Sequence, residues 1–63
     1  MSPKKICVLV VDDHPIVRRG LIAEINLNPE MQVVGEAKNG LEAIDMVEIL
    51  KPDVILMDIV MPE

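Results

Sequence analysis

Two short continuous hydrophobic runs and one mixed apolar segment predict the strands of this chain. Residues 6–11 (ICVLVV) are uninterrupted and mostly β-branched, which is typical of a strand buried on both faces at the centre of a parallel sheet. Residues 54–57 (VILM) form a second run of the same kind. Residues 31–37 (MQVVGEA) are a weaker strand candidate, because Gly35 and Glu36 suit an edge position better than a central one.

Two segments with helical spacing separate these strands. Pro15 suits the first turn of a helix, and one apolar face follows it, made of Ile16, Val17, Leu21, Ile22 and Ile25. Asn39 suits the cap of a second helix, with Glu42 as its capping-box partner and Pro52 as its stop. The buried face predicted for that helix consists of Leu41, Ala43, Ile44, Val47 and Leu50.

The predicted order is β-α-β-α-β, which specifies an α/β fold with a parallel sheet and right-handed helical crossovers. Residues 54–57 would then form an open, strongly apolar edge. We therefore expect residues 1–63 to be a truncated domain, the first half of a larger α/β unit. A self-sufficient small domain is the alternative, but such domains usually need a staple, and the single Cys7 allows no internal disulfide.

Charge and composition exclude several functions. Eleven acidic residues against six basic ones give a formal net charge of −5, and Phe, Trp and Tyr are absent. An acidic chain without aromatic residues is a poor candidate for binding nucleic acid or an anionic membrane surface. The apolar run 6–11 is too short for a signal peptide core or a membrane span, so a cytoplasmic location is expected.

Acidic residues follow two of the predicted strands directly. Asp12 and Asp13 end the first strand, and Asp58 ends the third. Ligands of open α/β sheets bind outside the carboxyl ends of the strands, so these carboxylates converge if the two strands are neighbours. A hard cation such as Mg²⁺ would relieve their repulsion. Asp58 stands alone and suits a nucleophile toward phosphorus, whereas the adjacent pair suits the metal.

A structural interpretation of the same carboxylates stays open, because acidic residues after strands are often helix caps or solvated loop ends. For Asp53 that interpretation is favoured, since this residue precedes its strand and lies at the opposite end of the sheet. His14 is expected to help start the helix at Pro15 rather than act as a base. Arg18 and Arg19 are candidates for contact with a kinase, or one is solvated with its stem on apolar surface.

Three longer segments together resemble the receiver domain of bacterial two-component response regulators. They are residues 8–15 (VLVVDDHP), residues 34–37 (VGEA) with Asn39-Gly40 and Glu42-Ala43, and residues 52–62 (PDVILMDIVMP), in this order. The first and second resemble the NarL/LuxR-type subfamily in particular. Members of that subfamily usually carry a C-terminal helix-turn-helix DNA-binding domain, so the resemblance implies a parent protein that regulates transcription. No DNA-binding segment is expected in this chain itself.

The resemblance also implies a role for each site residue. Asp58 would accept a phosphoryl group from a sensor histidine kinase, so the chain would be a phosphorylated signalling module of a phosphorelay and not a turnover enzyme. Asp13 would ligate Mg²⁺ directly, Asp12 largely through water, and the Val60 carbonyl would be a further ligand. The implied fold is a flavodoxin-like sheet, of which only strands 1–3 are expected here. The Ser or Thr and the Lys that complete a receiver site come after the fourth and fifth strands, beyond these residues.

Two other functions compete with this interpretation. One is an inert fragment that self-associates as a homodimer through the open edge at residues 54–57 without being phosphorylated. The other is a metal-dependent phosphatase of the haloacid-dehalogenase type, which also uses a strand-end Asp nucleophile. That family has a second Asp two residues after the nucleophile, where this chain has Val60, so the phosphatase is disfavoured.

Overall fold

The structure is a computed structural model, and it describes residues 4–57. Its elements are β1 (Ile6–Val11), α1 (Pro15–Asn26), β2 (Met31–Ala37), α2 (Gly40–Leu50) and β3 (Val54–Met57). The strand–helix alternation predicted from the hydrophobic pattern is confirmed. Within the described part of the chain, no helix is long and apolar enough to cross a membrane.

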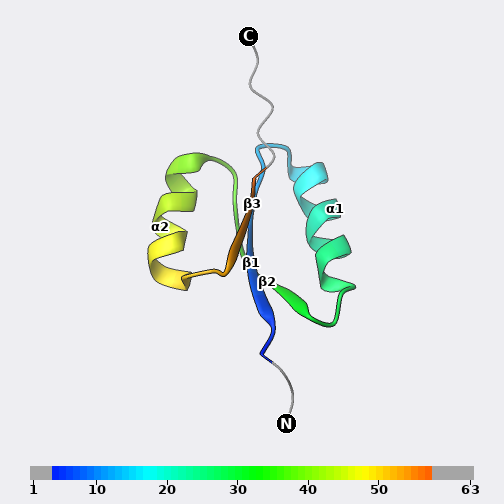
Figure 1. The fold of residues 1–63 in the computed structure, drawn as a ribbon. Coiled ribbons are helices and arrows are strands. Elements are labelled where there is room, and N and C mark those ends of the chain that lie inside the picture. The colour runs from blue at the N-terminus through cyan, green and yellow to red at the C-terminus, as the bar shows by residue number, and fades with distance from the viewer. Residues whose placement is uncertain (1–3, 58–63) are drawn as a thin grey trace.

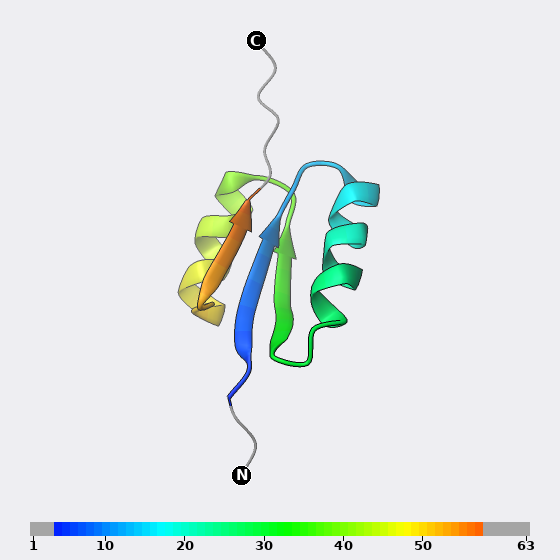
Figure 2. The same cartoon turned by 45° about the vertical axis from the view of Figure 1, so that its right-hand side comes forward.

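A parallel three-stranded sheet in the order β2-β1-β3 forms the centre of the molecule. The two helices lie on opposite faces of this sheet, α1 on one side and α2 on the other (Figures 1 and 2). The edge position expected for β2 is confirmed. The first and third strands are also neighbours, so their carboxyl ends lie at the same end of the sheet, which the predicted acidic site requires.

β1 supplies most of the buried core. Four consecutive residues of this strand are at most 1% exposed, namely Val8, Leu9, Val10 and Val11. Both faces of a central strand are covered when helices lie on the two sides of a sheet, which explains why the whole run is apolar. The core continues into Ala37 of β2 and Ala43 of α2.

The buried face of α2 is narrower than the sequence predicts. Ala43 is buried, and Met46 and Val47 pack partly buried against the core, but Leu41 and Ile44 are 78% and 63% exposed. The prediction that Leu41 and Ile44 are buried is wrong for the described structure, and Leu50, predicted on the same buried face, is 38% exposed. The reason is that α2 contacts β1 and β2 only, so nothing described here faces the flank of the helix that carries Leu41 and Ile44.

The apolar face of α1 is similarly incomplete. Leu21, Ile22 and Ile25 are half-buried, whereas Ile16 is 86% exposed and Val17 is 45% exposed. Helical spacing therefore identified the correct face of α1. It overestimated how far toward the start of the helix that face is covered.

A local irregularity in β2 lets α2 approach the sheet closely. The register between β1 and β2 shifts between Val8 and Leu9, which leaves Val34 as an extra residue in β2. The next residue is Gly35, and a Cβ there would lie 2.6 Å from Leu50 Cδ1 and 3.4 Å from Leu9 Cδ1. The Leu50 side chain of α2 therefore fills the space that a side chain at Gly35 would need.

Polar contacts fix where α2 and β3 begin. Asn39 Oδ1 accepts a hydrogen bond from the Glu42 N–H at 2.8 Å, which confirms the predicted cap. Glu42 in turn accepts from the Lys38 N–H at 3.0 Å, one residue before the position that a capping box uses. Asp53 Oδ2 accepts from the Cys7 N–H and the Asp53 N–H donates to the Cys7 carbonyl, both at 2.8 Å, so Asp53 joins β1 to the start of β3.

The close approach at Gly35 predicts that a larger residue there destabilises the fold, and that the loss depends on the Leu50 side chain. Gly35→Val should lower the free energy of unfolding by about 2 kcal/mol, because the added methyl groups displace Leu50 and crowd Leu9. Urea unfolding followed by circular dichroism would measure this. In a Leu50→Ala background the cost of Gly35→Val should be less than half as large. Gly20→Ala is the matched control, since a Cβ there meets nothing within 4 Å, and an equal cost of Gly35→Val in both backgrounds would contradict the steric explanation.

Candidate functional site

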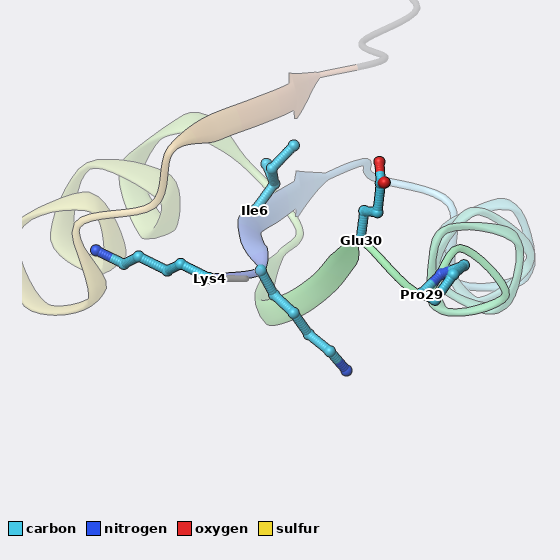
Figure 3. Close-up of a pocket in the computed structure, with 5 residues that line it drawn as sticks. Lys4, Ile6, Pro29 and Glu30 are labelled. Atoms are coloured by element: carbon cyan, nitrogen blue, oxygen red, sulfur yellow. The ribbon is translucent and has the colours of Figure 1, made fainter. Parts of the chain in front are cut away.

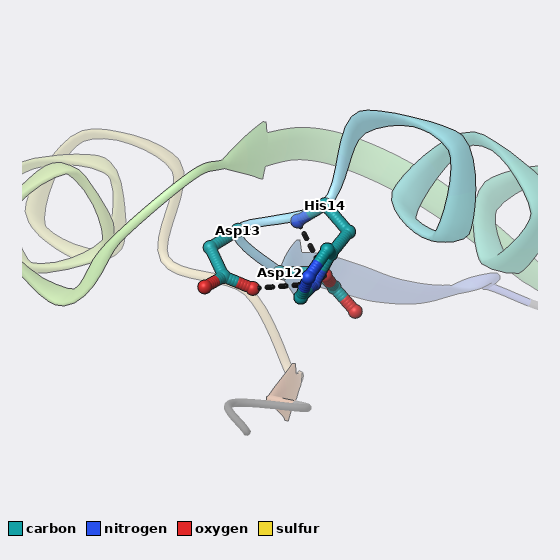
Figure 4. A group of neighbouring side chains, drawn as sticks. All are labelled: Asp12, Asp13 and His14. Atoms are coloured by element: carbon teal, nitrogen blue, oxygen red, sulfur yellow. Dashed lines mark hydrogen bonds and ion pairs between the residues drawn. The ribbon is translucent and has the colours of Figure 1, made fainter. Parts of the chain in front are cut away.

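Three consecutive polar residues form a compact group after the end of β1. Asp12, Asp13 and His14 each offer one ligand atom, and these three atoms all lie within 4.8 Å of one another (Figure 4). Asp12 is 1% exposed, whereas the side chains of Asp13 and His14 are 50% and 59% exposed. The group therefore combines one buried carboxylate with two donors that solvent reaches.

The backbone of this turn is held on both sides. The Asp12 N–H donates to the Ala37 carbonyl at 3.0 Å, which continues the pairing of β1 with β2. Asp12 Oδ1 accepts from the His14 N–H at 2.7 Å, a contact that closes a tight turn around the first aspartate. The His14 carbonyl then accepts from the Arg18 N–H at 2.8 Å, which begins α1.

Arg18 ties the turn to the neighbouring strand. Its Nη1 donates to the Asp12 carbonyl at 2.9 Å, and its Nε donates to Glu36 Oε1 at 2.7 Å. Only 16% of the Arg18 side chain is exposed. Arg19, by contrast, is exposed, as expected for the solvated member of the pair. The structural role of Arg18 is one that the sequence analysis missed, and the available signal was an acidic residue, Glu36, near the carboxyl end of the adjacent strand.

His14 occupies the N-cap position of α1, and in that sense it helps start the helix as predicted. Among the residues described, however, its side chain makes no cap hydrogen bond. His14 Nδ1 lies 2.7 Å from Asp13 Oδ1 and 3.6 Å from Asp12 Oδ1 (Figure 4). The imidazole therefore faces the two carboxylates, a position that the sequence analysis did not anticipate.

The donor set fits a divalent cation. Carboxylate oxygens are the protein ligands that Mg²⁺ prefers, and that ion usually takes only one or two of them while keeping several waters. A half-exposed Asp13 suits direct ligation, and a buried Asp12 fixed by its own turn suits a supporting role. Asp58 and Val60, the other residues predicted to form this site, lie outside the described residues.

A separate hollow lies at the other end of β1 and is lined by Lys4, Lys5, Ile6, Pro29 and Glu30 (Figure 3). Ile6 begins β1 and Glu30 directly precedes β2, whereas the acidic group follows the last residue of β1. The two features are therefore at opposite ends of the sheet. None of the residues predicted to act in phosphoryl transfer lines the hollow.

Comparisons with known proteins all point to one family. Residues 8–63 match the model of the response regulator receiver domain. The chain is 48% identical over 62 residues to a protein-glutamate methylesterase/protein-glutamine glutaminase of Pyrococcus abyssi. It is 50% identical over 56 residues to the transcriptional regulatory protein YdfI of Bacillus subtilis. These alignments cover 98% and 89% of this chain, but only 17% and 26% of the two relatives.

Solved structures agree with this result. The response regulator domain of Thermotoga maritima CheB is 53% identical, with a TM-score of 0.87, and the match covers 95% of this chain and 45% of that one. The signal receiver domain of a NarL regulator from Mycobacterium tuberculosis is 42% identical, also with a TM-score of 0.87 and 95% coverage of this chain. The match covers 48% of the NarL receiver chain.

A parallel sheet in the order β2-β1-β3, an acidic turn after its central strand, and a family match over residues 8–63 lead to the same conclusion. The chain belongs to the response regulator receiver domain family, the phosphoacceptor domains of two-component signalling systems.

Proposed function

We propose that this chain accepts a phosphoryl group on Asp58 in a reaction that depends on Mg²⁺. The observation that carries the proposal is the register of β1 and β3, in which Val11 pairs with Met57. Asp12 follows Val11 in the chain and Asp58 follows Met57. Two adjacent parallel strands thus end in register, each one residue before an aspartate, which supports a shared site at their carboxyl ends.

In this proposal Mg²⁺ is held by Asp13 directly, by Asp12 largely through water, and by Asp58 and the Val60 carbonyl. The ion would neutralise charge on the phosphoryl oxygens. An oxygen of the Asp58 carboxylate forms the new bond to phosphorus, while the bond from phosphorus to the donor breaks and its electron pair leaves with the donor. The turn that carries Asp12 and Asp13 is fixed by a hydrogen bond from Arg18 to the Asp12 carbonyl and by one from the Asp12 N–H to the Ala37 carbonyl.

Receiver domains obtain phosphoryl groups from sensor histidine kinases, and we infer such a kinase as the partner of this chain in the cytoplasm. We also infer that the parent protein regulates transcription. The relatives that support this inference include YdfI of Bacillus subtilis and NarL of Escherichia coli. The methylesterase of Pyrococcus abyssi supports a different parent, and only the sequence beyond the receiver region would distinguish the two. We further propose that residues 1–63 supply strands 1–3 of the receiver sheet.

Phosphorylation should be visible by intact-mass spectrometry after incubation with acetyl phosphate and Mg²⁺. The expected result is the addition of one phosphoryl group, which is lost in Asp58→Asn and when EDTA removes the metal. Asp53→Asn is the matched control. Asp53 bonds to Cys7 where β1 and β3 begin, at the end of the sheet away from the acidic turn, so this substitution should leave the adduct unchanged. A folded chain without an adduct, or an adduct that persists in Asp58→Asn, would contradict the proposal.

Arg18 is expected to act as a positioning residue for the metal. Arg18→Met keeps an apolar stem but removes the bonds to the Asp12 carbonyl and to Glu36. Mg²⁺ affinity should therefore fall about tenfold or more, as when partners that orient metal ligands are removed elsewhere. Isothermal titration calorimetry suits the measurement, since the chain has no Trp or Tyr to report binding. Arg19→Met is the control, and equal losses in the two variants would rule out this role.

Self-association is a second candidate function, favoured by the exposure of β3. Its apolar side chains Val54, Ile55, Leu56 and Met57 are between 37% and 51% exposed, so the burial predicted for this run is wrong for the described structure. The strand pairs with β1 on one side, and in the described structure its other side is an open edge. Such an edge can pair with the same strand of a second copy, which gives the homodimer as the proposed alternative.

Light scattering during size-exclusion chromatography distinguishes this alternative from a monomeric module. If β3 pairs between copies, the chain should elute as a dimer, and Ile55→Lys should shift it to the monomer because charged side chains oppose edge pairing. Leu41→Lys is the matched control, since it places the same charge on an exposed apolar position of α2. A wild-type monomer at high concentration would exclude the dimer.

A further inference from the structure

β3 is an apolar strand with neither face covered. Successive side chains of a strand point to opposite faces of the sheet, and all four of Val54–Met57 are between 37% and 51% exposed. Their partners on β1, residues 8–11, are at most 1% exposed. In the part of the chain that the structure describes, both helices lie against β1 and β2, and β3 contacts β1 alone (Figure 2). β3 therefore lacks a helix on each face as well as a strand on its outer side.

The opposite edge of the sheet is protected against strand addition. The Val33 N–H of β2 donates to Asn26 Oδ1 at 3.3 Å, so a side chain of α1 already uses this group. The extra residue Val34 also interrupts the regular ladder of β2. β3, by contrast, pairs with β1 in continuous register and carries no charge. A further strand is therefore expected at β3 and not at β2.

A second copy of the chain would cover only part of this surface. If two β3 strands paired with each other, the helices of each copy would still lie against its own β1 and β2, out of contact with β3. The apolar side chains of both β3 strands would stay exposed on both faces of the joint sheet. Each copy also carries a formal net charge of −5, which opposes association. The surface fits a partner that brings helices together with a strand.

Solved receiver domains contain polypeptide of this kind. More than half of the Thermotoga maritima CheB domain and of the Mycobacterium tuberculosis NarL receiver domain lies outside the part that matches this chain. We propose that β3 docks a separate polypeptide that corresponds to this remainder, with a parallel strand on the outer side of β3 and a helix over each of its faces. The inference does not require phosphoryl transfer to Asp58.

The test uses as its probe the part of the Thermotoga maritima CheB domain that lies outside the match. Mixed with this chain, the purified polypeptide should give a 1:1 complex of summed mass, measured by light scattering during size-exclusion chromatography. The matched part of the same CheB domain is the control and should not bind. Calorimetric titration should show that Ile55→Lys weakens binding about tenfold or more, because it places a charge on the docking strand. Leu27→Lys is the matched variant, since Leu27 is 78% exposed and follows α1, and it should bind as the wild type does.

Hydrogen exchange of the wild-type complex gives a second measurement that needs no variant. Amide protection should increase more at residues 54–57 than at residues 31–37, because only the β3 edge gains a neighbour. Equal binding of the matched CheB part, equal losses in Ile55→Lys and Leu27→Lys, or a larger gain of protection in β2 would overturn the inference. So would a wild-type homodimer that does not bind the probe. If the complex forms as expected but Asp58 accepts no phosphoryl group, the proposed function fails while the inference stands.

Discussion

Burial of β1 on both faces is the constraint on which the rest of the structure depends. A strand with four consecutive fully buried residues needs a strand on each edge and a helix on each face. β2 and β3 provide the edges, and α1 and α2 cover the faces. Because parallel pairing brings all three carboxyl ends to one end of the sheet, the same arrangement that covers β1 also places the acidic turn where an open α/β sheet binds its ligands.

Hydrogen bonds from neighbouring elements hold the buried carboxylate of this turn in place. Asp12 is nearly inaccessible to solvent, yet its main-chain and side-chain groups are engaged by Ala37, His14 and Arg18. A buried carboxylate is tolerated when such hydrogen bonds compensate for lost water. The guanidinium of Arg18 spans from this turn to Glu36 on β2, so the geometry of the candidate cation site depends on the pairing of β1 with β2 as well as on the local sequence.

Sequence reasoning recovered what has a local signal and missed what depends on tertiary contacts. Apolar runs without charges identified β1 and β3, and Pro15 and Asn39 identified where the helices begin. Helical spacing alone did not reveal that Leu41 and Ile44 are exposed, because exposure depends on what else covers the sheet. The acidic pair and the structural role of Asp53 followed from strand ends. The contact of Arg18 with Glu36, by contrast, joins residues of two elements whose proximity only the fold creates.

Joining β1 to Asp53 also has a kinetic consequence. Cys7 lies 25 positions before its partner Gln32 on β2 and 46 positions before Asp53 at the start of β3. Contacts this distant in sequence close large loops and slow folding. During synthesis β1 emerges first but acquires its second neighbour only when residues 54–57 have left the ribosome. The most hydrophobic segment of the chain thus spends the longest time incompletely covered, and exposed apolar surface and unpaired strand edges of this kind are what promotes aggregation during folding.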